Sequence, residues 1–248
     1  SFFIPFLTLV VCCVLNGYAP FGPNNFFKGD GLSLSLPTMF QTQDQVKHNS
    51  LLLSWISGGG TNFFYTSPCA FLFYFLRFIS RDSIISFFTM FTIICISFSG
   101  YTFYYYMTHR QNSLPFRSTD ARILILSTAY CLCAYIINFR NNILWNPVYL
   151  LFPLIILAMD RLMYEGKKVF YIILLALSIY FNIFIAFFIC IYLIFVFFTY
   201  HFTNWKDFIK KGILFTYSSL LSAGISILMI LPTYLTFQNT AYESSDSV

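Results

Sequence analysis

The sequence predicts an all-α membrane protein, a polytopic helical bundle of about seven spans with a long external first loop that carries interfacial helices. Of the 248 residues, 58% are hydrophobic and only 9% are charged, whereas soluble domains carry about 25% charged residues. Several apolar runs approach or exceed the roughly 18 residues that a bilayer crossing requires. The lipid bilayer is therefore the expected partner. The net charge of +5 indicates no nucleic-acid partner, because the basic residues lie in short clusters between the apolar runs.

The spans follow from the apolar runs, which are 2–15, 84–107, 123–137, 148–159, 169–200 and 213–235. As a single helix, the run 169–200 would extend about 48 Å, longer than a hydrocarbon core of about 30 Å. The polar residue Asn182 lies near its middle. We therefore expect two short crossings joined near Asn182.

The basic residues predict the orientation, because Lys and Arg concentrate in short cytoplasmic loops. Most of them fall in three segments, at 110–122, 161–168 and 206–211. These segments share one side of the membrane only if the run 169–200 crosses twice. Asp160 and Arg161 are expected among the loop charges of that side.

The basic segments fall on the cytoplasmic side only if residues 16–82 contain no membrane crossing, so we expect 16–82 to be one external loop. Its aromatic stretch 63–79 contains Pro68 and is expected to lie in the outer interface, although a re-entrant helix satisfies the same parity. We expect a single transmembrane domain over 1–248, with 1–15 as first span, 83–236 as remaining spans and 237–248 as external tail. The chain is expected to be a fragment of a longer protein.

Asp30 is the acidic residue most readily assigned to chemistry. It lies between Gly29 and Gly31 in the external loop, where the glycines permit a tight turn and leave the carboxylate unobstructed. A carboxylate near a membrane surface can act as a general base or bind a divalent cation. A solvated aspartate in a glycine turn is the alternative.

Two further external stretches offer polar side chains. The first, 54–62, contains Trp55, three consecutive glycines and Asn62, and could approach a ligand closely. The second, 138–147, contains Arg140, Asn142 and Asn146. Its guanidinium geometry suits a phosphate, and its amides can hydrogen-bond a sugar. These residues are the candidate substrate-binding set.

The motifs of the chain, taken in order, resemble one family. They are the acid in the glycine-rich first loop, 53–55 with 58–62, 65–68, 129–137, 142–145, 151–154, 160–162 and 180–185. Together they are similar to the YfhO family of bacterial membrane proteins, whose members are much longer.

The resemblance implies a GT-C type glycosyltransferase fold in a multi-pass protein of the bacterial cell membrane. Such enzymes move a sugar from a polyprenyl-phosphate carrier to an acceptor on the outer face, here a cell-envelope polymer such as lipoteichoic acid. Asp30 falls where the family has its first-loop acid. The family usually has a second acid shortly after the Trp that corresponds to Trp145 of the stretch 138–147. Here Asn146 and Pro147 follow Trp145 instead.

Two other functions fit the residues. A transporter of lipid-linked precursors would hold the lipid tail in a groove between spans, as the enzyme would, but without bond chemistry. Ionisable residues within the spans usually mark transport pathways, and they are nearly absent from the predicted spans. A non-catalytic scaffold of a glycosylation complex fits the missing second acid and the short chain.

Overall fold

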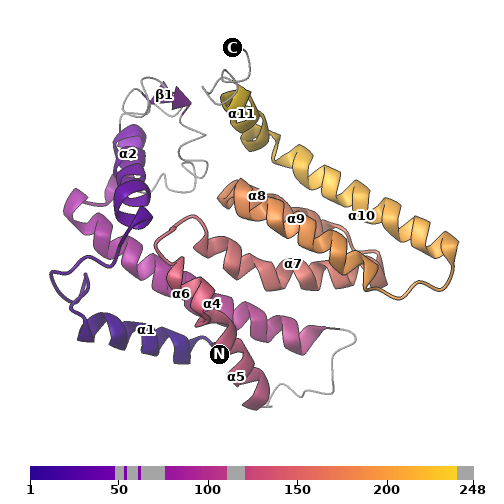
Figure 1. Ribbon diagram of the computed structural model, residues 1–248, viewed down its shortest axis with the longest axis horizontal. Helices are drawn as coiled ribbons and strands as arrows, with labels where there is room; N and C mark the ends of the chain where they lie inside the picture. The colour runs from indigo at the N-terminus through magenta and orange to yellow at the C-terminus, as the bar shows by residue number, and fades with distance from the viewer. Residues whose placement is uncertain (48–52, 55–60, 63–75, 111–120, 239–248) are drawn as a thin grey trace, which may run out of the picture.

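The computed structural model describes residues 1–47, 53–54, 61–62, 76–110 and 121–238 (Figure 1). Its elements are α1 (Phe3–Leu15), a π-helical turn η1 (Gly31–Ser35), α2 (Leu36–Lys47), β1 (Leu53–Ser54), β2 (Thr61–Asn62), a 3-10 turn η3 (Arg81–Ser83), α4 (Ile84–His109), α5 (Ala121–Cys131), α6 (Ala134–Asn138), α7 (Asn146–Glu165), α8 (Val169–Phe181), α9 (Ile183–Phe198), α10 (Trp205–Ile225) and α11 (Ile227–Gln238). The two short strands pair antiparallel, with Leu53 opposite Asn62. The described part is otherwise helical, which confirms the all-α membrane class.

Within the described residues, three helices are long and apolar enough to cross a membrane, at 81–109, 121–138 and 146–165. A fourth candidate span is the pair α10 and α11, which is bent by 71° at Ser226. The remaining apolar helices are shorter: α1 and α8 have 13 residues each and α9 has 16. At 1.5 Å per residue they extend about 20 to 24 Å.

Asn182 divides the long apolar run as predicted. Its backbone is extended, with φ −161° and ψ 109°, and it ends α8. Its side-chain oxygen then accepts a hydrogen bond of 2.8 Å from the backbone N–H of Ile185, which caps the start of α9. An amide oxygen in this position satisfies a donor that the first turn of a helix leaves unpaired. The break is therefore encoded by one residue.

Two predicted spans differ from the observed helices. The span 123–137 is interrupted, because Cys133 has an extended backbone that separates α5 from α6. The span expected at 213–235 begins earlier, at Trp205, because the Asn204 side chain accepts a 2.9 Å hydrogen bond from the backbone N–H of Asp207 and caps the helix there. Hydropathy alone does not register a capping residue, so it places this start too late.

The helices α4, α7, α8 and α10 lie across the molecule in this order (Figure 1), and each contacts the next. α7 is the central helix: 72% of the residues in its most apolar 18-residue stretch are buried, compared with 22% for the stretch 121–138. The core around α7 is formed by aliphatic side chains such as Ile155, Met159 and Leu162.

The basic segments meet at one end of the bundle. Asp160 of α7 accepts a 2.5 Å hydrogen bond from the Tyr200 hydroxyl, just after α9, and its other oxygen lies 3.3 Å from Nε of Arg110, just after α4. The ends of α4, α7 and α9 therefore lie together, so the chain turns back at Asn182 and α9 ends beside the end of α7, as two crossings by the run 169–200 would require. Asp160 is only 2% exposed, so the expectation of a loop charge was wrong: α7 continues past it to Glu165.

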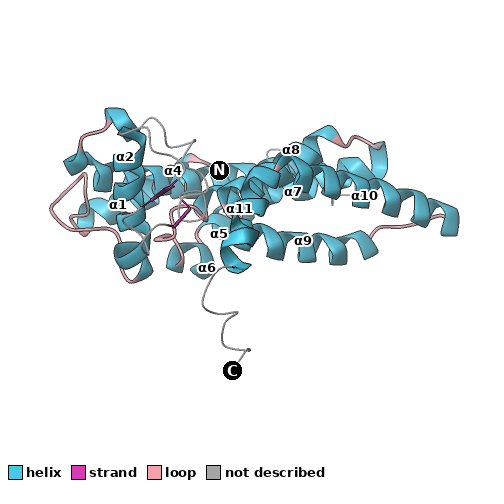
Figure 2. Cartoon of the chain, turned by 90° about the horizontal axis from the view of Figure 1, so that it is seen from above, coloured by secondary structure: helices cyan, strands magenta, loops and turns pink. Residues whose placement is uncertain are grey.

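The segment that we predict to be external lies at the opposite end of the bundle, which we refer to as the external end after that prediction. Figure 2 shows α2 and the beginning of α10 at opposite ends of the long axis. A second core holds the external segment against the helix ends, and it joins Phe26, Phe27 and Met39 to Ile84 and Ile143. Residues far apart in sequence are thereby brought to one site.

Candidate functional site

A cavity of about 280 Å³ opens at the external end of the bundle. Four segments line it: the Asp30 turn, the start of α2, the 139–145 stretch before α7, and Asn182 between α8 and α9. Its lining residues are Asp30, Ser35, Thr38, Met39, Phe139, Asn142, Ile143, Leu144, Trp145 and Asn182. Asp30 is the only acidic residue among these described lining residues, and it is exposed. We refer to this cavity as the polar pocket.

The glycines around Asp30 have two separate roles. Gly29 adopts φ +52°, in the left-handed region that favours glycine, and its carbonyl accepts the N–H of Leu32 and of Ser33 at 2.9 and 3.0 Å. Gly31 packs against Asn141: a Cβ at Gly31 would lie 2.5 Å from the Cβ of Asn141. Only glycine allows this approach, so Gly31 holds the Asp30 turn directly against the 138–147 stretch.

The structure places the three residues of that stretch differently. Asn142 lines the polar pocket together with Asp30. Arg140 lies beside the pocket, where one of its Nη atoms donates to the Ile137 carbonyl at 2.7 Å and its guanidinium lies 5.0 Å from the centre of the Phe26 ring. Asn146 is 1% exposed beneath it.

Asn146 fixes the position of the 138–147 stretch through two hydrogen bonds. Its amide nitrogen donates to the Arg140 carbonyl at 3.0 Å and to Thr92 Oγ1 of α4 at 3.3 Å. Its side-chain oxygen is buried, with no hydrogen-bond partner among the described residues. A buried amide that bridges a loop carbonyl and a neighbouring helix fixes the loop geometry, since leaving either group unpaired is costly. Asn146 therefore connects Arg140 to the membrane helices.

Two residues of the polar pocket had been assigned other roles in the sequence. From the sequence, Asn182 is expected only to separate two crossings. The predicted orientation puts this break on the same side of the membrane as Asp30, and the structure places both residues in the lining of the polar pocket. Trp145 was interpreted as an interfacial anchor. Its ring stacks between Phe139 and Phe184, with centroid distances of 5.4 and 6.2 Å.

The stretch 54–62 is described only in part. Asn62 is the last residue of β2, while Trp55 lies outside the described residues. Of the predicted interfacial stretch 63–79, positions 63–75 also lie outside, and Leu76 is fully buried in the external core. The contribution of Trp55 and Asn62 to substrate binding stays a prediction.

A divalent cation at Asp30 would have to be held by few protein ligands. No group of three His, Cys, Asp or Glu side chains suited to a metal occurs among the described residues. The polar pocket offers one carboxylate, two amides and the hydroxyls of Ser35 and Thr38. This oxygen set fits Mg²⁺, which is commonly bound by one or two carboxylates plus the phosphate oxygens of a substrate.

A second cavity of about 280 Å³ is lined by residues about one turn further along three of the elements that line the polar pocket, and the two cavities share no lining residue. On α9 the lining passes from Asn182 to Ile185, and at the start of α7 it passes from Trp145 to Val148. The third element is α6, where it passes from Phe139 to Tyr135, whose rings lie 4.8 Å apart. The remaining lining residues are Tyr130, Tyr149, Phe152, Phe188, Ile189 and Tyr192. We refer to this cavity as the aromatic groove.

The polar pocket and aromatic groove together form an amphipathic site at the external end of a helical membrane protein. The chain matches the family described as Bacterial membrane protein YfhO over residues 1–247. Neither a curated protein nor a solved structure gives a match. Since the family match extends over nearly the whole chain, this protein belongs to the YfhO family of bacterial membrane proteins.

Proposed function

We propose that the chain is the donor-site portion of a membrane glycosyltransferase. It would transfer a sugar from a polyprenyl-phosphate carrier to a cell-envelope polymer, such as lipoteichoic acid, on the outer face. The observation that carries this proposal is that the polar pocket and the aromatic groove are lined by successive turns of the same elements. A lipid-linked sugar has a polar head and a long apolar tail, and each cavity matches one of these parts.

The tail is expected to lie in the aromatic groove. Its lining consists of aliphatic and aromatic side chains from α5, α6, α7 and α9, and burial of apolar surface against such walls contributes about 25 cal/mol per Å². The stacked rings of Phe139 and Trp145 line the polar pocket, about one turn from residues of the aromatic groove on the same elements. This position suits an aromatic contact with the first isoprene units or with the face of the sugar.

The head is expected to lie in the polar pocket. The amides of Asn142 and Asn182 supply both donors and acceptors for sugar hydroxyls. Arg140 uses one donor on Ile137, and its guanidinium has five N–H donors in all. The others would be available to the carrier phosphate after a small side-chain movement toward the pocket.

The reaction is a displacement at the anomeric carbon. The acceptor hydroxyl forms the new C–O bond while the bond from the anomeric carbon to the phosphate oxygen breaks, and the phosphate leaves with the electron pair. Asp30 accepts the proton of the acceptor hydroxyl; alternatively it holds a cation that neutralises the leaving phosphate, and an oxygen of that phosphate takes the proton. The sequence resemblance implies the donor class, and the pocket geometry supports the position of the acid.

Sugar transfer from a radiolabelled polyprenyl-phosphate sugar tests the proposal in membranes. We expect Asp30→Asn to abolish transfer to the polymer while the protein still inserts. Asp82→Asn is the matched control, because Asp82 is an exposed carboxylate of the same external region that does not line the pocket. Transfer by Asp30→Asn at the wild-type rate would contradict the role of the acid.

Chelation separates the two roles of Asp30. If the carboxylate holds a cation, then removal of divalent metal stops transfer by the wild type and Mg²⁺ restores it. If Asp30 is the base, transfer survives chelation and is lost only in Asp30→Asn. Absence of transfer by the wild type under both conditions would favour a scaffold.

A further inference from the structure

Another cavity lies away from Asp30, between α8, α9 and α10. Its volume is about 460 Å³. Its walls are largely apolar and aromatic: the lining residues are Tyr171, Cys190, Ile194, Phe197, Phe198, Gly212, Phe215, Thr216, Ser219 and Leu220. We refer to it as the α9–α10 groove.

The groove presents an apolar surface. Two of its polar side chains form a hydrogen bond with each other: the Tyr171 hydroxyl lies 2.9 Å from the Ser219 Oγ. Gly212 leaves space beside Phe197, since a Cβ there would only just touch that ring, at 3.6 Å. Leu220 at its edge is 67% exposed. In a bilayer, such a groove between helices is a place for an acyl chain.

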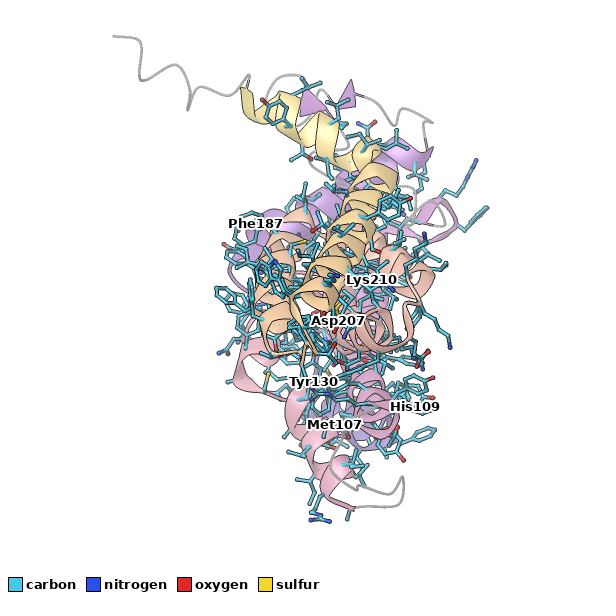
Figure 3. The ribbon with its side chains drawn as sticks, turned by 90° about the vertical axis from the view of Figure 1, so that its right-hand side faces the viewer. Met107, His109, Tyr130, Phe187, Asp207 and Lys210 are labelled. Carbon is cyan, nitrogen blue, oxygen red and sulfur yellow. The ribbon has the colours of Figure 1, made fainter. Side chains whose placement is uncertain are left out.

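Cations lie around the basic end of this groove. Lys210 and Lys206 precede Gly212 on α10, at exposed positions. Figure 3 looks onto the molecule from this side and labels Lys210 and Asp207 on α10. The Lys168 ammonium lies 5.1 Å from the centre of the ring of Tyr217, which follows the lining residue Thr216 in the sequence of α10.

Among the described residues, the carboxylates of this end do not cancel this charge. Asp207 is paired with Lys211 at 3.0 Å, and Glu165 with Lys167 at 2.6 Å. The positive charges of Lys168, Lys206 and Lys210 remain in excess. Trp205 is 71% exposed and stacks on Phe208 at 5.0 Å, a position typical of the membrane–water interface.

We propose that the α9–α10 groove binds an anionic phospholipid of the cytoplasmic leaflet. One acyl chain lies along the groove, and the headgroup phosphate is bound by Lys206 and Lys210, with Lys168 contributing from α8. Basic residues at the cytoplasmic end of an interhelical pocket favour anionic headgroups. This inference does not rest on the proposed function, because the groove shares no lining residue with the polar pocket or the aromatic groove.

Native mass spectrometry of the purified protein in detergent tests this inference. Phosphatidylglycerol and phosphatidylcholine with identical acyl chains are the probes. We expect the wild type to retain phosphatidylglycerol preferentially. Lys206→Gln and Lys210→Gln should each lower that retention by about fivefold, since a lysine near an anionic headgroup contributes about 1 kcal/mol. Lys47→Gln, an exposed lysine of α2, is the control and should leave retention unchanged.

The acyl-chain part needs a separate variant. Gly212→Leu fills the groove and should lower retention of both lipids, whereas Gly224→Leu, in the same helix with no neighbour within 4 Å, should not. Equal retention of the two lipids by the wild type overturns the inference, as does equal retention by Lys210→Gln and Lys47→Gln. Unchanged retention in a folded Gly212→Leu protein overturns the groove as the site. Should that variant fail to fold, the exposed lysine variants still decide.

Discussion

The contact between Gly31 and Asn141 makes the geometry of the polar pocket sensitive to a single methyl group. In Gly31→Ala, the new Cβ would lie 2.5 Å from the Cβ and 3.2 Å from the backbone oxygen of Asn141. Two carbon atoms prefer a separation of about 3.5–4.0 Å. A Cβ position is fixed by the backbone, so no change of rotamer relieves the clash. The Asp30 turn and the 138–147 stretch must therefore separate by about 1 Å.

That displacement moves Asp30 relative to Asn142. A misplacement of about 1 Å lowers an enzymatic rate by about 100-fold, because the reacting groups are no longer held in alignment. We also expect a loss of about 1–3 kcal/mol in stability from overpacking. The assay is initial-rate sugar transfer in membranes, together with the thermal midpoint of the purified protein.

Gly29→Ala is the matched control. Gly29 has φ +52° but no neighbour within 4 Å of a Cβ, so the substitution introduces backbone strain of about 1–2 kcal/mol without a clash. Its transfer rate should fall by less than that of Gly31→Ala. Wild-type transfer and a wild-type thermal midpoint in Gly31→Ala would refute the reasoning.

Two further predictions concern stability, measured as the thermal midpoint in detergent. Asn182→Ala removes the cap of α9 and should cost about 1 kcal/mol, whereas Asn182→Ser retains a capping oxygen and should recover most of it; equal midpoints for the Ala variant and the wild type would exclude the cap. Tyr200→Phe removes the donor to the buried carboxylate of Asp160 and should cost about 1–3 kcal/mol. The exposed hydroxyl removed in Tyr217→Phe should cost little, and coincident midpoints for these two variants would contradict a stabilising role of the Tyr200 bond.

The sequence predicts the structure correctly where composition or a single residue sets it. Hydrophobic content predicts the membrane class, since long apolar runs are stable only when buried in lipid or protein. Asn182 predicts the break between α8 and α9, because a polar residue between two apolar runs can cap a helix. The three basic segments predict that the ends of α4, α7 and α9 share one side, and the contacts of Asp160 bear this out.

Periodicity and hydropathy failed where tertiary contacts set the boundary. The early start of α10 depends on the Asn204 cap, and the burial of Asp160 depends on Arg110 and Tyr200, which lie far from it in sequence. No local pattern distinguishes a carboxylate in a loop from one that is buried by partners from two other helices.

The sequence by itself determined that this protein is a helical membrane protein of the YfhO family, which end carries positive charge, and that Asp30 lies in a glycine turn on the other side. Only the tertiary structure decided which residues share a site with Asp30. Asn142 and Asn182 line the same pocket because Gly31 can approach Asn141 and because α8, packed against α7, brings the chain back to the end at which α7 began. Such neighbours are set by packing between distant segments, and packing depends on the shapes of side chains that are not adjacent in sequence.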